Sequence, residues 1–247
     1  MYTFNELFGL WIRVLRSPKQ GVQEVMSKNP TLMDGIIAGA IAGGIVGLIT
    51  GVLGFLITLI FGFWFLGIFF LILGPIIGAI EGGIEVLIGA VIYYIIAMLF
   101  GGKTKFNVFC GVYGVAVSPI ILLSSAVSLA QMVISMVAGV EMVSSAFLGS
   151  YGAVAGAFGT LMIIQAIFLI ISLLIIVYAI FIISKVIQAV YNFDSEKALL
   201  VAAIPIIVVV LIMIISIFGI TLYHPHMYYS GPYNYTQLTD LQVQATE

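Results

Sequence analysis

Long apolar stretches separated by short polar ones dominate this chain. No ionisable side chain occurs between Gly35 and Ile80. Further apolar stretches extend over residues 86–100, 108–138, 158–185 and 198–222. About 20 apolar residues suffice for a helix to cross a bilayer. The pattern therefore predicts an all-α, polytopic integral membrane helical bundle, with two of its spans before residue 100.

The composition excludes a water-soluble globular chain. Of 247 residues, 63% are hydrophobic and only 7% are charged, whereas soluble domains have about 25% charged residues. A transmembrane β-barrel would show alternating segments of about ten residues, but residues 161–184 carry apolar residues on every side. The single cysteine, Cys110, excludes an intrachain disulfide framework. A net charge of −2 without a basic block predicts no nucleic-acid partner.

The first 30 residues predict two short surface helices. Five apolar residues recur at helical spacing: Phe4, Leu7, Phe8, Trp11 and Leu15. Arg13 and Arg16 project from other faces, so we expect an amphipathic helix that lies flat in the membrane interface. Ser17 as N-cap and Pro18 at the first helical position then start a second helix, which ends near Lys28.

Charged residues indicate the number and direction of the spans. If there are five spans, all positive charges fall on one side of the membrane: Arg13, Arg16, Lys19, Lys28, Lys103, Lys105, Lys185 and Lys197. Glu141 and the residues after 222 fall on the other side, without Lys or Arg. This positive-inside pattern predicts a cytoplasmic N-terminus and an extracytoplasmic C-terminus. Six spans would place half of the positive charges outside.

The chain then divides into three parts. Residues 1–30 form the cytoplasmic amphipathic surface helices, residues 31–222 form a five-span membrane domain, and residues 223–247 form a polar extracytoplasmic tail. Asn234 opens an Asn-Tyr-Thr triplet, an acceptor for N-glycosylation, and the five-span topology places it outside.

Local signals concern the ends of the first two spans. Thr31 and Asp34 have capping-box spacing ahead of an apolar run, so Asp34 is expected to cap the first span. Residues 61–75 leave two alternatives open. They form a partly re-entrant or interfacial segment on the outer side, or they form the bent start of a long second helix.

Glycine recurs every fourth residue in the first two spans. The positions are Gly35, Gly39, Gly43, Gly47 and Gly51, followed by Gly78 and Gly82. Four residues advance about 400° around an α-helix, so each set forms a stripe that a neighbouring backbone can approach closely. We expect these glycines to serve helix packing; the alternative is that they line a pore or permit bending in a transporter. The pattern does not decide whether the partner face belongs to the same chain or to a second copy.

Glu81 and Glu85 lie one helical turn apart in apolar surroundings. Intramembrane carboxylates are candidates for a proton or cation site. With about four residues between Glu81 and the expected outer end of the second span, we favour an outer interfacial position, where neither side chain needs a partner.

No combination of residues indicates catalysis. His224 and His226 flank Pro225, but two histidines without a third ligand make a weak metal site. No histidine precedes residue 224, so Ser118 has no evident partner for a Ser-His pair. Walker, HExxH and G-x-S-x-G motifs do not occur in the sequence. We expect no enzyme activity, no cofactor and no metal.

Three short motifs lie in and around the later spans. They comprise Gly101, Gly102, Lys103 and Phe106 between two spans, Tyr113 and Pro119 in the next span, and Ser195, Lys197 and Ala198 at the start of the last span. Together with a surface helix at residues 8–18, they resemble the Yip1 domain family over residues 4–220, and the minimal prokaryotic members most closely. The resemblance implies a five-span helical domain with a cytoplasmic N-terminus.

Eukaryotic relatives in that family are associated with trafficking and with prenylated small GTPases. Their long cytoplasmic N-terminal region has no counterpart in this sequence, which argues against a small GTPase as partner. The leading hypothesis is a non-enzymatic, Yip1-like membrane scaffold or adaptor in membrane organisation or trafficking. It would engage membrane lipid and either copies of itself or another membrane protein. The rival hypothesis is a small transporter or channel that uses Glu81 and Glu85 as an intramembrane carboxylate pair.

Overall fold

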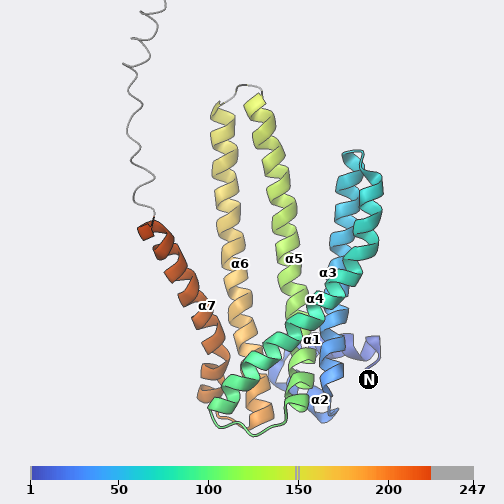
Figure 1. Cartoon of the computed structure of the whole chain (residues 1–247), viewed down its shortest axis with the longest axis vertical. Coiled ribbons are helices and arrows are strands. Elements are labelled where there is room, and N and C mark those ends of the chain that lie inside the picture. The colour runs from blue at the N-terminus through green and yellow to red at the C-terminus, as the bar shows by residue number, and fades with distance from the viewer. Residues whose placement is uncertain (1, 148, 150, 224–247) are drawn as a thin grey trace, which may run out of the picture. The chain divides into compact units, whose positions relative to one another are not determined.

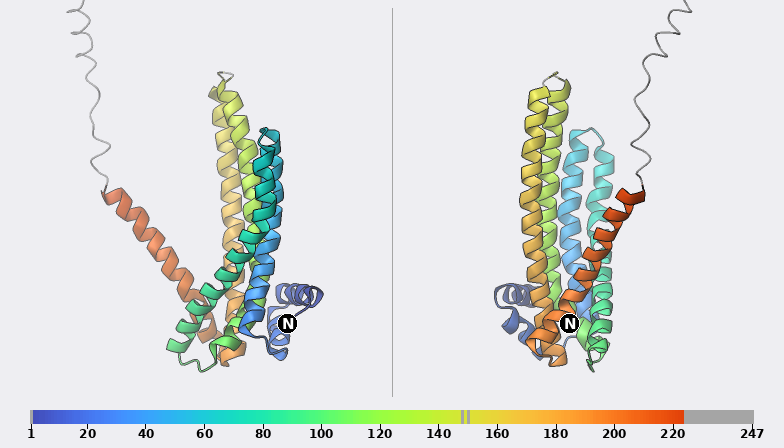
Figure 2. Two further views of the ribbon diagram at one scale, coloured as in Figure 1. Left: turned by 45° about the vertical axis from the view of Figure 1, so that its right-hand side comes forward. Right: turned by 90° about the vertical axis from the view of Figure 1, so that its left-hand side faces the viewer.

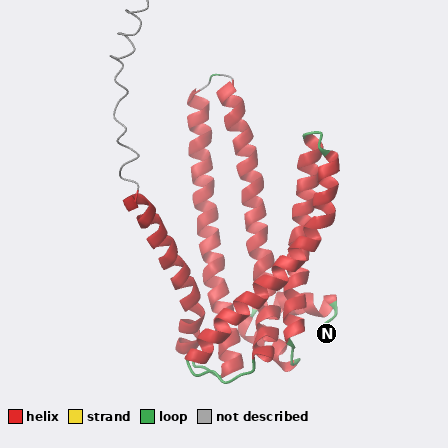
Figure 3. Ribbon diagram, in the orientation of Figure 1, coloured by secondary structure: helices red, strands yellow, loops and turns green. Residues whose placement is uncertain are grey.

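The computed structural model describes residues 2–147, 149 and 151–223. In these residues it contains seven α-helices and no strand (Figures 1 and 3). The helices are α1 (Phe4–Arg16), α2 (Pro18–Ser27), α3 (Leu32–Ile60), α4 (Trp64–Leu99), α5 (Phe106–Phe147), α6 (Tyr151–Tyr191) and α7 (Ser195–Tyr223). Helices α3 to α7 are each long and apolar enough to cross a membrane. The predicted all-α, multi-pass membrane bundle with five spans is confirmed. His224, His226 and Asn234 lie outside the described residues, as does the predicted tail beyond Tyr223.

The chain divides into two units within α7. The first unit ends at Ala203 and contains α1 to α6 with the first turns of α7. The second unit begins at Ile204 and continues α7 to Tyr223, with Pro205 inside the helix. In the second unit, the side chains of residues 207–212 are all apolar.

Helices α3 and α4 form an antiparallel hairpin in the first unit (Figure 1). The hairpin turns at residues 61–63, where Gly62 has a φ of +78°, a conformation that glycine adopts without strain. Helix α4 begins at Trp64, continues through Pro75 and bends along its length (Figures 1 and 2). Residues 64–75 are therefore the bent start of a long helix and do not form a separate re-entrant segment.

Local hydrogen bonds start the first helices. The backbone N–H and hydroxyl of Thr31 donate to Asp34 Oδ2 at 2.9 and 2.8 Å, so the predicted cap of α3 is confirmed. Thr3 and Glu6 form the same capping box at α1, which was not predicted. Ser17 is the N-cap of α2, but its side chain makes no capping hydrogen bond. The reason is that Ser17 also ends α1, with a ψ of 76° instead of the extended value that a capping side chain requires.

The buried core of the first unit lies at one end, called the core end below. Helices α1 and α2 and the loops before α5 and α7 gather there (Figures 1 and 2). In α5 the buried side chains end at Ile121, and in α6 they lie almost entirely within residues 182–191. The segments that carry all eight Lys and Arg residues are also at this end. Farther along, the same helices expose apolar side chains.

Helix α1 packs against the protein with only part of its apolar face. Leu7 and Trp11 are each 2% exposed, in a cluster with Leu10 and Val14, and α1 contacts α2 and α5. Phe4 remains 56% exposed, and its ring stacks on that of Phe8. The apolar residues expected to form one membrane-facing surface are therefore divided between the protein interior and an exposed strip.

Candidate functional site

The glycine stripe of α3 lies directly against the backbone of α4. Three pairs of glycines face each other: Gly39 and Gly82, Gly43 and Gly78, and Gly47 and Gly74. A Cβ atom built on Gly39 would lie 2.5 Å from the carbonyl oxygen of Gly82, and one built on Gly43 would overlap the carbonyl oxygen of Gly78. Gly51 faces the Phe70 backbone in the same way. The two backbones thus approach each other at a distance that only glycine accommodates.

Gly35, the first glycine of the stripe, faces α5 instead. A Cβ atom built on Gly114 would lie 2.5 Å from the Cα atom of Gly35. The partner faces of the stripe therefore belong to α4 and α5 of the same chain. Gly152 and Gly156 have the same four-residue spacing, yet a Cβ atom on either would meet no atom of the described residues within 4 Å. Spacing alone does not identify a contact.

A groove of about 370 Å³ runs along the α3–α4 hairpin beside α5. Its floor includes glycines of the hairpin, at which the backbones of α3 and α4 are in contact with each other. Its apolar lining residues are Val46, Phe69, Phe70, Leu73, Ile77 and Ile121. Its polar lining residues are Thr50, Glu81, Glu85 and Ser125. The groove is thus apolar over most of its length, with two carboxylates toward the core end.

Glu81 and Glu85 lie in the middle of α4. Seventeen helical residues precede Glu81, since α4 begins at Trp64. The adjacent Gly82 faces Gly39 of α3, a helix long and apolar enough to cross a membrane. Residues 64–75 belong to the same helix, so α4 extends much farther before Glu81 than the expected four residues, and the outer interfacial position of the two carboxylates stays a prediction.

No residue in the described part of the chain supplies a counter-charge to the two carboxylates within the groove. Among the described residues, no hydrogen bond or ion pair involves either Glu81 or Glu85. None of the described residues that line the groove is Lys or Arg. The basic residues lie instead in the segments at the core end.

Aromatic rings from three helices meet at the core end. The ring centroid of Phe109 lies 5.7 Å from that of Tyr113, 6.2 Å from that of Tyr94 and 5.4 Å from that of Tyr191. Tyr93, Phe106 and Phe193 extend this aromatic cluster. Gly102 fits against the Tyr191 ring, where an added Cβ atom would lie 2.6 Å from Cδ1. The cluster joins α4, α5 and α6 with the loops that precede α5 and α7.

The motif residues lie in and around the aromatic cluster. Those that belong to it or touch it are Gly102, Phe106, Tyr113 and Lys197. The Nζ atom of Lys197 lies 4.4 Å from the Phe193 ring centroid. Ala198 and Pro119 are buried, Lys103 and Ser195 are exposed, and Gly101 turns the chain with a φ of +89°. Nearby, the Thr104 hydroxyl donates to the carbonyl oxygen of Val190 at 2.8 Å and ties the loop to α6.

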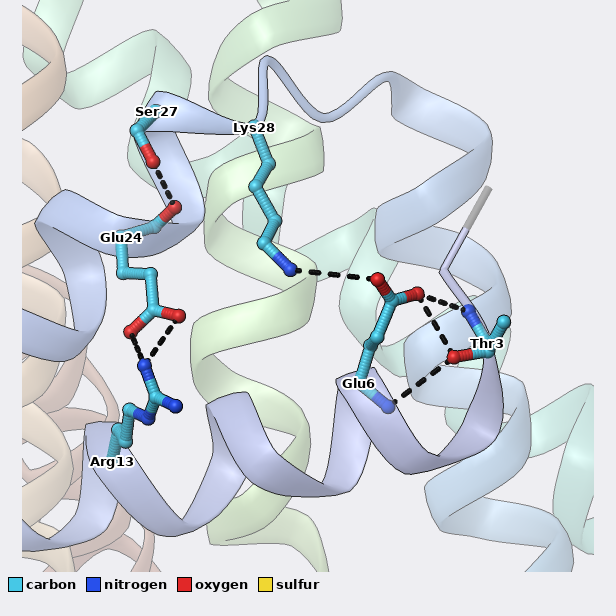
Figure 4. A network of polar contacts seen from close by, with 6 residues as sticks. All are labelled: Thr3, Glu6, Arg13, Glu24, Ser27 and Lys28. Atoms are coloured by element: carbon cyan, nitrogen blue, oxygen red, sulfur yellow. Dashed lines mark hydrogen bonds and ion pairs between the residues drawn. The ribbon is translucent and has the colours of Figure 1, made fainter.

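Polar contacts hold α1 to α2 (Figure 4). Arg13 Nη1 lies 2.6 Å from both carboxylate oxygens of Glu24, and Lys28 Nζ lies 3.9 Å from Glu6 Oε1. Hydrogen bonds from the backbone N–H and hydroxyl of Thr3, with Lys28 nearby, lower the pKa of the Glu6 carboxyl. Burial raises the pKa of Tyr2 to about 12. Helices α1 and α2 are thus held together by these ion pairs and hydrogen bonds at the core end.

Sequence reasoning missed a polar contact between α5 and α6. Gln131 Nε2 donates to Gln165 Oε1, and Gln165 Nε2 donates to Ser135 Oγ at 2.8 Å. An amide side chain within an apolar span is expected to hydrogen-bond to another helix. The two glutamines in apolar stretches were therefore the sequence feature that could have indicated this contact.

The chain matches no family model, no curated protein and no solved structure.

Proposed function

We propose that the protein is a non-enzymatic membrane adaptor of the Yip1-like type, which receives another membrane protein in the groove beside the α3–α4 hairpin. The observation that carries the proposal is the groove itself, bounded by α3, α4 and α5 and open along much of its length. Since the glycine stripe contacts α4 and α5 of the same chain, it supports a rigid floor rather than association with a second copy.

The rigidity of the groove favours recognition of a partner. Its floor is set by backbone contacts, which leave little freedom for the hairpin to change width. A groove preformed in this way loses less conformational entropy when a helix docks in it. The proposed role therefore needs no large rearrangement of the hairpin.

Photo-crosslinking in native membranes tests the adaptor function. A benzophenone side chain at Thr50, which lines the groove, should give one discrete adduct with a membrane protein. The matched control is position 174 on α6, where Leu174 is exposed and does not line the groove. Identical adduct patterns from both positions, or lipid adducts alone, would contradict the proposal.

We further propose that the core end faces the cytoplasm, since the segments bearing all eight Lys and Arg residues are there. Cysteine labelling of a Cys110→Ala chain tests the orientation. An impermeant thiol reagent added from outside should label Glu141→Cys and leave Thr104→Cys unlabelled. The reverse result would invert the proposed topology.

A small cation or proton transporter is the second candidate, favoured by the position of Glu81 and Glu85 in the middle of α4. Proteoliposomes with an internal pH-sensitive dye and an imposed potassium potential distinguish the two functions. An adaptor should give the same proton flux as empty liposomes, with or without Glu81→Gln and Glu85→Gln. A flux in the wild type that the double variant loses would replace the adaptor with a transporter.

A further inference from the structure

We infer that the groove binds a transmembrane helix that carries a Lys or Arg side chain at the level of Glu81 and Glu85. This inference rests on the proposed adaptor function and specifies the chemistry of the partner. The groove combines an apolar lining that extends along α4, against which a helix can lie, with two carboxylates at one place along it.

The charge of the groove argues for a basic partner. Both carboxylates line the groove one helical turn apart, and among the described residues neither has a hydrogen bond or an ion pair. Ionisable side chains within a membrane usually pair with another polar group. None of the described residues that line the groove is basic, so we assign the complementary charge to another molecule.

The dimensions of the groove argue for a helix. Its lining on α4 extends from Phe69 to Glu85, which corresponds to about 24 Å of helix at a rise of 1.5 Å per residue. This length covers most of the hydrocarbon core of a bilayer, which is about 30 Å thick. The glycine faces of α3 and α4 are occupied by each other, so a docking helix would contact the flanking Phe and Ile side chains, which offer it an apolar surface.

The polar lining fits an inorganic cation poorly. Metal ions such as Ca²⁺ take about six to eight oxygen ligands, and these have to converge. Thr50 lies one residue from Gly51, which faces Phe70, so its hydroxyl is far along the groove from Glu81. That hydroxyl already donates to the carbonyl oxygen of Val46 at 2.9 Å. Two carboxylates on successive turns suit a Lys ammonium or an Arg guanidinium instead.

Peptide binding to the purified full-length protein in liposomes tests the inference. The probes are two fluorescent 23-residue Leu-Ala helices that differ only at the central residue, which is Lys in one and Leu in the other. Energy transfer from the labelled protein reports binding. We expect the Lys peptide to bind about tenfold more tightly, because only its central side chain can pair with Glu81 and Glu85. This ratio corresponds to a difference of about 1.4 kcal/mol in binding free energy.

Variants of the groove separate charge from shape. Glu81→Gln with Glu85→Gln should abolish the preference for Lys, whereas the matched control Glu141→Gln, on a carboxylate that does not line the groove, should retain it. Ser125→Trp fills the groove without removing a carboxylate and should weaken binding of both peptides. Equal binding of the two peptides to the wild type, or a Lys preference that survives the double variant, would overturn the inference.

The two proposals fail in distinguishable ways. If crosslinking from Thr50 captures a partner whose span has no basic residue, the adaptor function stands and the inference on charge is wrong. If neither peptide binds and proton flux depends on Glu81 and Glu85, both proposals are wrong. Binding that requires an amine-bearing phospholipid, with no response to either peptide, would assign the groove to lipid and also overturn the inference.

Discussion

The core end and the distal half of the first unit are held together by different means. At the core end, large side chains such as Phe109 and Trp11 are buried, and rings from several segments are in contact. In the distal half of the α3–α4 hairpin, the contacts are between backbones at glycines such as Gly47 and Gly74. Between α5 and α6, an amide contact of Gln131 and Gln165 lies among exposed apolar side chains.

The different packing of the two regions fits the way in which helices associate in lipid. Lipid competes for apolar surface as well as a neighbouring helix does, so helices within a bilayer associate through close backbone approach and polar contacts. The core end brings together loops and helix ends, where large side chains can interlock among several segments. The structure therefore pairs a well-packed end with hairpins that separate beyond it and leave the groove between α3, α4 and α5.

The largest expected effect is at the aromatic cluster. Phe109→Ala should lower the free energy of unfolding by about 3 to 5 kcal/mol, since it removes a fully buried ring in contact with three others. Denaturation with SDS in mixed micelles measures this change. Phe158→Ala, at an exposed ring on α6, should change stability by less than about 0.5 kcal/mol. Similar losses at both positions would show that the core end is not the better packed region.

The same small substitution should have opposite signs at two glycines. Gly43→Ala should destabilise the protein by about 1 to 3 kcal/mol, because the added methyl group overlaps the Gly78 carbonyl oxygen. Gly139→Ala should stabilise α5 by up to about 1 kcal/mol, since nothing lies within 4 Å of the added atom and alanine favours the helix. Unfolding in mixed micelles measures both. A neutral effect of Gly43→Ala would mean that the backbones of α3 and α4 are not in close contact at this position.

The polar contact of the distal half should contribute less. Gln165→Leu should lower stability by about 0.6 to 1.7 kcal/mol, because Gln131 and Ser135 lose their partner across the helices. Spin-label distances between the distal parts of α5 and α6 should also broaden. Thr160→Val is a matched control, since the Thr160 hydroxyl donates only to the carbonyl oxygen of Gly156 in its own helix.

The smallest expected effect is a pH dependence of α1. The pKa of Glu6 is below its ordinary value of 4.5 in the folded protein, so its stabilising contribution is complete above that value. The contribution is lost as the pH falls through the lowered pKa. Amide hydrogen exchange of α1, corrected for intrinsic rates, should show falling protection over this range. Glu6→Gln should remove the dependence; if it persists, another group is responsible.

Features with a local cause were predictable from the sequence. The spans follow from apolar stretches between charged clusters, and the Thr31 and Asp34 cap depends on residues three positions apart. The position of Glu81 was not predictable in the same way, because Pro75 and its neighbouring glycines suggest a break where α4 in fact continues. Helix continuity through proline depends on tertiary contacts, here those of Gly74 and Gly78 with α3.

Contacts between distant segments had weaker signals. The motif residues were found by resemblance, but the sequence gives no reason to join Gly102 to Tyr191 or Phe109 to the same ring. The groove is also a product of packing, since its lining comes from three helices. Glycine spacing predicted a stripe on α3, yet equal spacing at Gly152 and Gly156 brings neither glycine close to another helix in the described part of the chain. The identity of a partner face thus depends on topology.

The glycine repeat has a consequence for the alignment of α3 and α4. Because glycines recur every fourth residue on both helices, a displacement of α4 by one turn would again match three pairs: Gly43 with Gly82, Gly47 with Gly78, and Gly51 with Gly74. The glycines therefore specify closeness but not register. The three-residue turn at 61–63 selects one register among near-equivalent ones. The length of this turn therefore sets the position of α4 along α3. A longer turn could let α4 shift by four residues, about 6 Å, which would move Glu81 and Glu85 along α3 and still place glycine against glycine.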